Sequence, residues 1–419
     1  MADIAKLDVW LFAKLVGTLQ FERGNLSFTY ASSWLNRKSS VPLSCSLPLQ
    51  PERFGDQVAR PFFAGLLPEG QMRQLLCKQF RISIENDFAL LNEIGGECAG
   101  AVTFVEHGST FEEITDDDSA VQWLSDKELV TVLEELPRRP MLAGDNEIRL
   151  SLAGAQSKLP VIVDGTQIGL PKKAAPSTHI LKPAISNVAD SVVNEAFCLQ
   201  LAGSLSLDAA IATIRRVKDH QFLLVQRYDR VGESPTAMQR LHQEDFCQAM
   251  AVIPEMKYQN EGGPDFTQCF DLVRSVTKPP APQILKLLDY VFFNTLMCNN
   301  DAHAKNYSLL FEGRTPGLAP LYDVLCTAIY PDVSKKMAMK IGSKYHFEQV
   351  MPRHWEQFAH STGLGYAQMK KRLKQFATIL PEAAHRLQKQ DMLWHREPAV
   401  SKIIEKVEAR CELTVKRLS

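Results

Sequence analysis

The sequence predicts an α+β fold with two lobes, in which the N-terminal part is rich in β-strands and the C-terminal part is mostly α-helical. Residues 1 to about 60 form short runs of strand-like alternation that turn residues separate. Residues 148–228 are again mostly strand-like, with a helix near 190–202. From about residue 240 onward, apolar residues recur at helical spacing, except near 306–325. A chain of 419 residues exceeds one ordinary core, so we expect more than one lobe.

Changes in composition divide the chain into four segments. Residues 1–110 form a β-rich N-terminal subdomain that also contains helices, and residues 111–147 form a connecting segment. Residues 148–230 form the N-terminal part of a second, larger domain, and residues 231–419 form its helical C-terminal lobe. The connecting segment is polar and acidic, and prolines interrupt it at Pro137 and Pro140.

The overall composition excludes two broad classes of protein. Hydrophobic residues make up 45% of the chain and charged residues 23%, values that are typical of globular proteins and exclude a wholly disordered chain. The net charge is −1, whereas proteins that bind nucleic acid without a partner protein usually carry an excess of basic residues. Any contact with DNA is therefore expected to be local or shared with a partner.

Cysteine usage and hydropathy predict a cytoplasmic location. The nine cysteines include no C-x-x-C pair, and most have apolar neighbours, so we expect small buried side chains in a reducing compartment. The N-terminus lacks the basic and apolar regions of a signal peptide, and no run approaches eighteen apolar residues. We expect no contact with a membrane.

The N-terminal segment is expected to begin as a small sheet. Residues 7–12 and 26–30 read as strands, and Gly17 and Gly24 are expected in turns between them. The pattern becomes helical from residue 61 to about 91, with a helix start at Asn86, and residues 101–105 return to a strand.

The most specific motif of the chain is Asp301-x4-Asn306 with Asp323 seventeen residues later. Residues 287–297 read as a buried helix that ends just before Asp301. Residues 307–311 and 318–322 read as two strands around a turn, so that this hairpin returns Asp323 to the side of Asn306.

This arrangement is typical of phosphoryl transfer. In protein kinases an Asp accepts the proton of the substrate hydroxyl, an Asn five residues later holds Mg²⁺, and a second Asp bridges Mg²⁺ to the phosphates of ATP. The hard oxygen ligands of Asn306 and Asp323 suit Mg²⁺. His303 and Lys305 lie between Asp301 and Asn306 and could contact phosphate or substrate. Alternatively, each of these residues caps a turn or ends a strand, but their joint spacing favours the kinase interpretation.

A lysine and a glutamate in the expected order support a two-lobed, protein-kinase-like fold. Lys182 ends an apolar strand of residues 179–182, as the strand lysine of kinases does. Thirteen residues later Glu195 lies on a helix that Asp190 or Ser191 is expected to cap, and it could form an ion pair with Lys182. The alternative for Glu195 is a solvated position in the first turns of a helix.

Two further segments could bind the nucleotide. The sequence has neither of the standard glycine-rich phosphate motifs, but a loop of small and polar residues precedes the strand at 159–163 and could bring its backbone amides to phosphate. Its residues are Ala153, Gly154, Ala155, Gln156, Ser157 and Lys158. The alternative is an ordinary hairpin turn. Residues 222–230 read as a strand and polar turn that suit a hinge, with Gln226, Arg227 and Tyr228 beside adenine. The alternative is a linker that binds no ligand.

At the level of whole motifs, the chain resembles the HipA family of serine/threonine kinase toxins from type II toxin–antitoxin modules. The resemblance spans nearly the whole sequence. Its markers are Gly-Leu-Leu-Pro-Glu at 65–69, Ser-Leu-Ala-Gly-Ala-Gln-Ser-Lys at 151–158, Thr-His-Ile-Leu-Lys at 178–182, Gln-Glu-Asp-Phe-Cys-Gln at 243–248, Asp-Ala-His-Ala-Lys-Asn at 301–306 and Leu-Tyr-Asp at 321–323.

The resemblance implies a role for each matching residue. Asp301 would be the catalytic base, Asn306 and Asp323 the Mg²⁺ ligands, Lys182 a contact to the ATP phosphates, and residues 153–158 the loop over the nucleotide. Members of the family autophosphorylate a serine at the position of Ser151, which inactivates them. One departure is Gln226, which stands where the family has Glu, so a side-chain contact to the nucleotide is in doubt there.

The resemblance also implies partners. These are a small antitoxin of the helix-turn-helix type (HipB-like), operator DNA bound through that antitoxin, and a protein substrate, which in the family is glutamyl-tRNA synthetase. Two alternatives to a toxin kinase stay open. One is a small-molecule or lipid kinase of related fold, and the other is a catalytically silent partner that only represses transcription with its antitoxin.

Overall fold

The computed structural model describes residues 4–109, 111, 120–144, 149–172, 175–186, 188–232, 234 and 238–419. The chain forms two compact units. The first unit comprises Met1–Pro183, Arg215–Glu255 and Leu309–Pro316, and the second comprises Ala184–Ile214, Met256–Ser308 and Gly317–Ser419. Each unit is built from separate parts of the sequence, and the four segments expected from composition stay a prediction.

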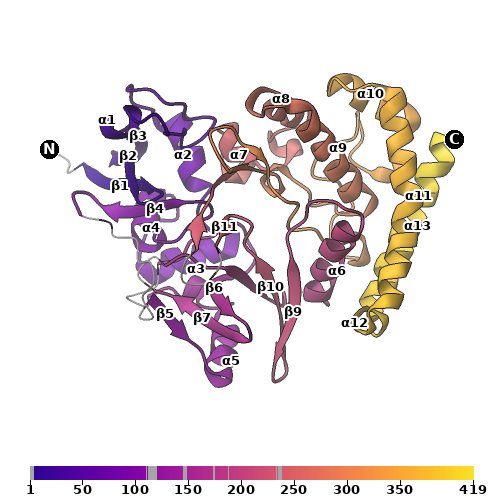
Figure 1. Cartoon of the computed structure of the whole chain (residues 1–419), viewed down its shortest axis with the longest axis horizontal. Helices are drawn as coiled ribbons and strands as arrows, with labels where there is room; N and C mark the ends of the chain where they lie inside the picture. Colours follow the sequence, from indigo (N-terminus) through magenta and orange to yellow (C-terminus); the bar gives the residue numbers. More distant parts are fainter. Residues whose placement is uncertain are drawn as a thin grey trace. The chain divides into compact units, whose positions relative to one another are not determined.

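The first unit begins with a four-stranded sheet in the order β3-β2-β1-β4 (Figure 1). Its strands are β1 (Ala5–Leu11), β2 (Lys14–Glu22), β3 (Asn25–Tyr30) and β4 (Val102–Glu106). The predicted strands at 7–12, 26–30 and 101–105 are therefore confirmed. Gly24 has φ +86° in the turn between β2 and β3, as expected.

The predicted turn at Gly17 is wrong, because Gly17 lies inside β2. A Cβ atom at this position would lie 2.3 Å from the carbonyl oxygen of Thr29 and 2.7 Å from the ring of Phe28. Gly17 therefore allows a close approach of β3 and of the Phe28 ring, and it does not serve a turn.

Four helices lie between β3 and β4 in the sequence: α1 (Ser32–Leu35), α2 (Asp56–Ala64), α3 (Gly70–Phe80) and α4 (Asp87–Ile94). The side chain of Asn86 accepts a hydrogen bond from Ala89 N at 3.0 Å and so caps α4, as predicted. Aromatic side chains of the sheet and of α2, among them Phe28, Phe63 and Phe104, share one buried core. The burial of large apolar faces by both layers holds this part together.

A six-stranded sheet forms the second half of the first unit, in the order β5-β7-β6-β8-β10-β9. The strands are β5 (Val121–Trp123), β6 (Leu159–Asp164), β7 (Gln167–Pro171), β8 (His179–Pro183), β9 (Ala212–Val217) and β10 (His220–Gln226). β5 and helix α5 (Asp126–Glu135) fall in the segment expected to be a connection. Ser125 and Glu128 form a capping box at the start of α5, a signal that the polar composition concealed.

The remaining strands of the first unit are short. They are β11 (Arg230–Val231), β12 (Gln239–Arg240), β13 (His242–Asp245), which precedes α7 (Phe246–Ala249), and β14 (Ser308–Phe311), which pairs with β13. Glu244 of β13 is buried and accepts hydrogen bonds from Ser44 Oγ and from Cys45 N. Burial raises the pKa of Glu244 to about 7.

Glu244 is expected to make stability fall between pH 5 and pH 8. The pKa of Glu244 in the folded state lies above the ordinary pKa of a glutamate. Its contribution to the free energy of unfolding is therefore fully present below that ordinary pKa, and it is lost as the pH rises through about 7. The shift corresponds to about 3 kcal/mol in the free energy of unfolding. Urea unfolding at both pH values should show this loss in the wild type and a much smaller one in Glu244→Gln. The exposed Glu52→Gln is the control, and an equal loss in both variants would contradict the assignment.

The second unit is mostly helical. Its helices are α6 (Ser191–Ser204), α8 (Phe266–Val276), α9 (Pro280–Leu296), α10 (Pro352–Ser361), α11 (Tyr366–Gln390), α12 (Met392–His395) and α13 (Pro398–Leu418), and β15 (Gly317–Leu318) is its short strand. The described residues also form short 3₁₀ turns. In the first unit this is η2 (Pro140–Leu142), and η3 (Pro254–Met256) spans the point in the sequence where the first unit gives way to the second. The second unit contains η4 (Gln259–Glu261), η5 (Ala304–Asn306), η6 (Thr327–Ile329) and η7 (Phe347–Gln349).

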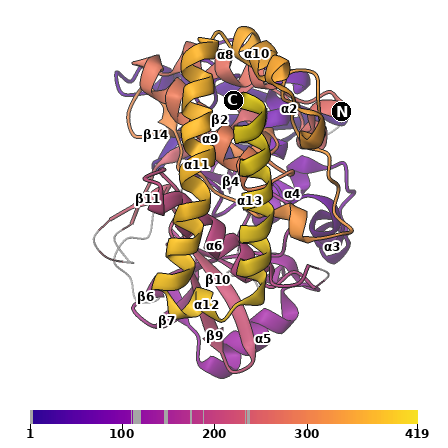
Figure 2. The ribbon, with the colours of Figure 1, turned by 90° about the vertical axis from the view of Figure 1, so that its right-hand side faces the viewer.

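Figure 2 shows the long helices α11 and α13 side by side, with α12 joining them at one end. Both helices also contact α6 and α9. Arg410 of α13 donates a hydrogen bond to the carbonyl oxygen of Thr295 at 3.0 Å, near the end of α9. The C-terminal helix thus supports the end of the buried helix that precedes Asp301.

These features confirm the predicted α+β fold, with a β-rich N-terminal region and a helical C-terminal region. Eight of the nine cysteines are buried, as their apolar neighbours suggested. Within the described residues, no helix is long and apolar enough to span a membrane.

Candidate functional site

Asp301 lies in a loop whose shape depends on two asparagines, Asn294 in the last turn of α9 and Asn299 just after the helix. The helix is buried on most of its surface and ends at Leu296. Asn299 donates a hydrogen bond from its side chain to Asn294 Oδ1 at 2.8 Å, and its own Oδ1 accepts one from Asp301 N at 3.2 Å. The polar residues at the helix end therefore fix the position of the loop, and they stop an otherwise apolar helix.

The carboxylate of Asp301 is exposed and is oriented by a tyrosine. Tyr258 donates a hydrogen bond from its hydroxyl to Asp301 Oδ1 at 2.7 Å, and its ring meets the ring of His303 edge-on at 5.1 Å. The backbone N–H of His303 also donates to the carbonyl oxygen of Asp301 at 2.7 Å, which makes a tight turn. The sequence does not predict the role of Tyr258, because no local pattern signals a contact across a separation of 43 residues.

The structure brings Asp301, Asn306 and Asp323 together, as their spacing predicted. Asn306 Nδ2 lies 3.4 Å from the carbonyl oxygen of Asp301 and 3.5 Å from that of Asp323. Asp323 has φ +57°, a left-handed conformation that Asp and Asn adopt more readily than most residues. The side chain of Tyr322 donates to the carbonyl oxygen of Lys305 at 2.6 Å and so links the two arms of the loop.

The predicted second strand at 318–322 is mostly wrong, since β15 covers only Gly317–Leu318. Ala319 N still donates to the carbonyl oxygen of Ser308 at 2.9 Å. Leu321 then exchanges backbone hydrogen bonds with residues 208–210 instead of continuing the hairpin. Asp323 is therefore placed by two different backbone partners, and the predicted strand at 307–311 is confirmed as β14.

The residues near Asp301 fit a magnesium ion that is shared with phosphates. The amide nitrogen of Asn306 faces two carbonyl oxygens, which turns its Oδ1 away from them. Among the described residues no group of three His, Cys, Asp or Glu side chains could hold a metal ion. Mg²⁺ in kinases uses few protein ligands, since phosphate oxygens and water complete its octahedron. An Asn and an Asp fit that donor set.

Lys182 and Glu195 are both buried, with 6% and 2% of their surface exposed. Lys182 lies on β8 opposite Leu223 of β10. Glu195 lies on α6, so the alternative of a solvated glutamate is wrong. They belong to different units, and their ion pair stays a prediction.

The predicted N-cap of α6 is confirmed in its position at Asp190, but it lacks the capping hydrogen bond. Asp190 occupies the N-cap position with φ +56° and makes no hydrogen bond from its side chain to the helix. The hydroxyl of Ser191 instead accepts a hydrogen bond from Ile185 N at 3.0 Å, and so holds the segment before the helix.

The loop of residues 151–158, called the nucleotide loop below, joins the N-terminal region to β6. Leu150 forms a parallel bridge with Glu97, and Gly154 forms one with Pro68. The bridges pair the residue just before the loop and one residue within it with other parts of the chain, so the loop is not an ordinary hairpin turn. Gly154 has φ +107°, which favours glycine.

Side chains of the nucleotide loop fold back onto the protein. Lys158 Nζ donates to the carbonyl oxygen of Ala153 at 2.6 Å, and Ser157 Oγ contacts Met72 Sδ at 3.3 Å. Ala155 is exposed and Gln156 is half-buried. Ser151 is fully buried, and its hydroxyl donates to the carbonyl oxygen of Leu66 at 2.8 Å.

The predicted hinge residues fall into three different environments. Gln226 ends β10 and is exposed, whereas Arg227 is buried and its N–H donates to the carbonyl oxygen of Thr178 at 2.9 Å. Tyr228 is half-buried, and its hydroxyl donates to Gln243. A contact of Arg227 with a nucleotide could come only from its carbonyl group, because protein partners enclose its guanidinium.

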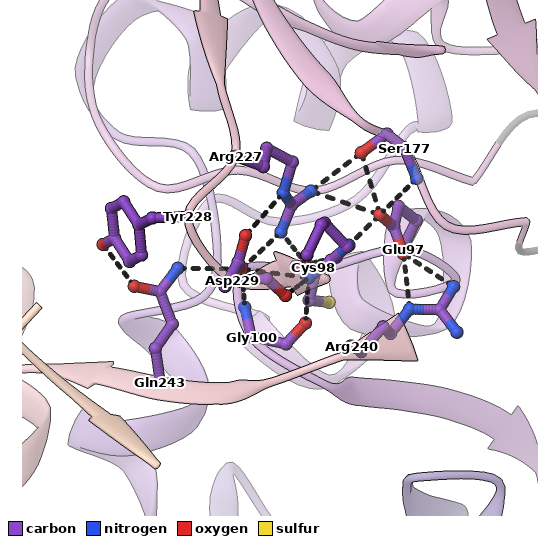
Figure 3. Close-up of polar contacts among 10 residues, drawn as sticks. Glu97, Cys98, Gly100, Ser177, Arg227, Tyr228, Asp229, Arg240 and Gln243 are labelled. Atoms are coloured by element: carbon purple, nitrogen blue, oxygen red, sulfur yellow. Dashed lines mark hydrogen bonds and ion pairs between the residues drawn. The ribbon is translucent and has the colours of Figure 1, made fainter. Parts of the chain in front are cut away.

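Those partners form a buried network of charges (Figure 3). Arg227 donates to both oxygens of Asp229 at 2.9 and 2.7 Å and to Glu97 at 3.2 Å. Arg230 and Arg240 each approach the carboxylate of Glu97 to 2.8 Å. Burial alone would raise the pKa of Glu97, but the three guanidiniums hold it well below its ordinary value.

The same glutamate contacts the segment just before β8, the strand that carries Lys182. The N–H and the hydroxyl of Ser177 both donate to Glu97 Oε1, at 3.0 and 2.9 Å. Asp229 also accepts from Gly100 N at 2.7 Å. Glu97 and Asp229 thus connect the N-terminal region to β8 and to the end of β10. The sequence offered one signal for this network, the charged run Arg227-Tyr228-Asp229-Arg230 directly after an apolar strand.

Models of one protein family match both the N-terminal and the C-terminal part of the chain. The model of the HipA N-terminal domain matches residues 7–105, and the model of the HipA-like C-terminal domain matches residues 150–384. A putative kinase of Sinorhizobium fredii is 42% identical over 383 residues, which cover 91% of each chain. The serine/threonine-protein kinase toxin HipA of Shewanella oneidensis is 28% identical over 398 residues, which cover 91% of this chain and 89% of that protein.

A solved structure extends this agreement to three dimensions. The HipA chain in a complex of HipA, HipB and operator DNA from Shewanella oneidensis superposes with a TM-score of 0.85 and 26% identity, over 98% of each chain. Together with the matches of both domain models, this likeness shows that the chain belongs to the HipA family.

Proposed function

We propose that this protein is an ATP-dependent serine/threonine protein kinase that acts as the toxin of a HipBA-like toxin–antitoxin module. The observation that carries the proposal is the closed loop in which Asn306 bridges the backbones of Asp301 and Asp323, with the carboxylate of Asp301 exposed. Two relatives carry the name kinase, and one of them is named a toxin kinase, which supports the same activity.

In this proposal each residue has a distinct task. Asp301 accepts the proton of the substrate hydroxyl, and Tyr258 orients its carboxylate. Asn306 and Asp323 hold Mg²⁺, which neutralises charge on the phosphates when it is bound. Lys182, His303 and Lys305 contact phosphates or substrate, and residues 153–158 cover the nucleotide. The exposed Gln226 offers its side chain at the end of β10.

The proposed partners follow from the relatives. The Shewanella structure contains HipB and operator DNA, which supports a small helix-turn-helix antitoxin and repression of the module's own operon. The proposed substrate is a protein of translation such as glutamyl-tRNA synthetase. Phosphorylation of Ser151 would be the off-switch, since a phosphate of charge about −1.5 to −2 does not fit the site that its hydroxyl occupies. A cytoplasmic location stays a prediction.

One labelling experiment separates this proposal from its alternatives. The purified chain is incubated with Mg²⁺, radiolabelled ATP and a bacterial lysate, after phosphatase treatment has removed any phosphate. Label on a protein, together with a gain of one phosphate on Ser151, supports the toxin kinase. Label on a metabolite alone would indicate a small-molecule or lipid kinase, and no transfer at all would indicate a silent corepressor.

Tyr258→Phe is expected to lower kcat roughly 3- to 10-fold. The change removes the hydrogen bond that orients Asp301, and such bonds contribute about 0.5–1.5 kcal/mol. KM for ATP should change less than about twofold, since the bond acts on the base. Initial rates of transfer to the labelled protein measure both constants. Tyr345→Phe removes a hydroxyl elsewhere in the same unit and serves as the control. An unchanged kcat would exclude this role for Tyr258.

A further inference from the structure

Two buried cysteines flank the residues around Asp301 and Asp323. Cys298 lies three residues before Asp301, and Cys326 lies three residues after Asp323. Cys298 is 2% exposed and Cys326 is fully buried, and both belong to the second unit. A covalent change at these cysteines would therefore act on the two chain segments that place the proposed base and one proposed metal ligand.

The segments of the two cysteines are joined through Thr327, the residue that follows Cys326. The N–H of Thr327 donates to the carbonyl oxygen of Cys298 at 3.1 Å, and its hydroxyl donates to the same oxygen at 2.9 Å. The N–H of Asn300 donates in turn to the hydroxyl of Thr327 at 3.0 Å. These bonds hold the segment of Cys326 directly against the segment that leads into Asp301.

The side chains of the two cysteines also meet. The thiol of Cys326 donates a hydrogen bond to the sulfur of Cys298. This bond, together with the nearby charge of Arg410, lowers the pKa of Cys298, although burial opposes the shift. The same bond and burial raise the pKa of Cys326. Cys298 is therefore the thiol that loses its proton more readily, and Cys326 is the thiol that keeps it.

Two further cysteines lie near this pair, but their thiols are less suited to react. Burial raises the pKa of both Cys198 on α6 and Cys411 on α13. The thiol of Cys198 donates to Asn194 Oδ1 at 3.3 Å. The same Oδ1 accepts a hydrogen bond from Cys326 N at 2.8 Å, so Asn194 also fixes the backbone of Cys326. The reactive pair is thus Cys298 with Cys326.

We propose that Cys298 and Cys326 form a modification site, which a peroxide oxidises to a disulfide, and that this disulfide lowers phosphoryl transfer at Asp301. The existence of the site concerns the two thiols alone, whereas its effect on transfer rests on the proposed kinase function. Disulfides in reducing compartments are typically transient and serve as redox sensors, so this one is reversed by thiol reductants. Because both thiols are buried, the oxidant is a small peroxide that enters through a local opening.

The oxidation proceeds in two balanced steps. The thiolate of Cys298 attacks one oxygen of hydrogen peroxide, the O–O bond breaks, and a sulfenic acid forms while hydroxide leaves. The thiol of Cys326 then attacks the sulfenic sulfur, so that an S–S bond forms and the S–O bond breaks. The hydroxyl group leaves as water with the proton of Cys326, and the hydroxide takes up the proton that Cys298 lost. The two thiols lose two electrons, and the peroxide gains them.

The disulfide is expected to displace the loop at Asp301. A disulfide bond is about 2.05 Å long, which is much shorter than the separation of two sulfur atoms in a hydrogen bond. The segments of Cys298 and Cys326 must therefore shift toward each other when the bond forms. A misplacement of about 1 Å can lower a rate about 10²-fold, so we expect phosphoryl transfer to fall at least about tenfold.

Mass mapping tests the site without any kinase activity. The reduced chain is treated with hydrogen peroxide, its remaining thiols are blocked with N-ethylmaleimide, and its peptides are analysed. A peptide pair linked through Cys298 and Cys326, which dithiothreitol separates, is the expected result. Cys198→Ser and Cys411→Ser are matched controls that should keep the link. The absence of this link in the treated wild type, or a link of either cysteine to another partner, would overturn the site.

Transfer of labelled phosphate to protein tests the effect of the disulfide. The oxidised wild type should transfer phosphate at least about tenfold more slowly than the same sample after dithiothreitol, whereas peroxide should leave the rate of Cys326→Ser close to its own reduced value. Equal rates of the oxidised and reduced wild type would overturn the effect on transfer. If neither form transfers phosphate to any protein, the proposed function fails and the effect fails with it, while the mapped link still decides whether the site exists.

Discussion

Asp301→Asn is expected to lower the rate of phosphoryl transfer about 10²- to 10⁴-fold while the protein keeps its fold. A positioned general base contributes about this factor, and an amide cannot take up the proton of the substrate hydroxyl. The side chain is exposed and asparagine has nearly the same shape, so the hydrogen bond with Tyr258 can be kept. The loss should therefore lie in kcat and not in the stability of the chain.

Two measurements check this prediction. Transfer of labelled phosphate to protein gives the rate, and growth of bacteria that express the variant gives the toxicity. Asp332→Asn changes an exposed aspartate of the same unit and should leave both unchanged. Growth arrest by the Asp301→Asn variant at wild-type level would refute the proposed mechanism.

Glu97→Ala is expected to destabilise the first unit by about 3–5 kcal/mol. The change removes the carboxylate that Arg227, Arg230 and Arg240 share at buried positions, and removal of one partner of a buried ion pair typically costs this much. Glu97→Gln keeps the volume and one acceptor but loses the charge, so it should fall between Ala and wild type. Urea unfolding at pH 7 measures the difference.

The effect of Glu97 should depend on pH in a defined direction. Its pKa is lowered in the folded state, so its contribution to stability is present above the ordinary pKa of a glutamate and is lost as the pH falls through the lower, folded value. The gap between wild type and Glu97→Ala should therefore shrink in acid. Glu85→Ala, at an exposed position of the same unit, is the control. A gap that stays constant down to pH 3 would contradict the assigned ion network.

The loop around Asp301 could be predicted because its determinants are close in the sequence. Asn306 lies five residues after Asp301, and a single turn returns the chain to Asp323, so spacing alone was enough to bring them together. The backbone route to Asp323 could not be predicted, since Leu321 pairs with residues about 110 positions earlier. A local pattern contains no information about such a partner.

The contacts that support the nucleotide loop could not be predicted for a similar reason. Glu97 meets Arg227 and Arg240 at separations of 130 and 143 residues, and each of these charged side chains alone predicts exposure to solvent. Gly17 was predicted in a turn because glycine is common in turns, whereas here the packing of Phe28 requires it. The strand β5 was hidden in a polar segment, since only its pairing with β7 makes it a strand.

The position of α13 bears on when the loop at Asp301 gains its support during synthesis of the chain. The helix at Pro398–Leu418 packs against α6 and α9, and Arg410 holds the carbonyl of Thr295 six residues before Asp301. The ribosome delivers Asp301 more than a hundred residues before this helix is complete, and at about 5–20 residues per second the delay is on the order of ten seconds. A nascent chain therefore lacks this support for the loop at Asp301 until residues 398–418 have been made.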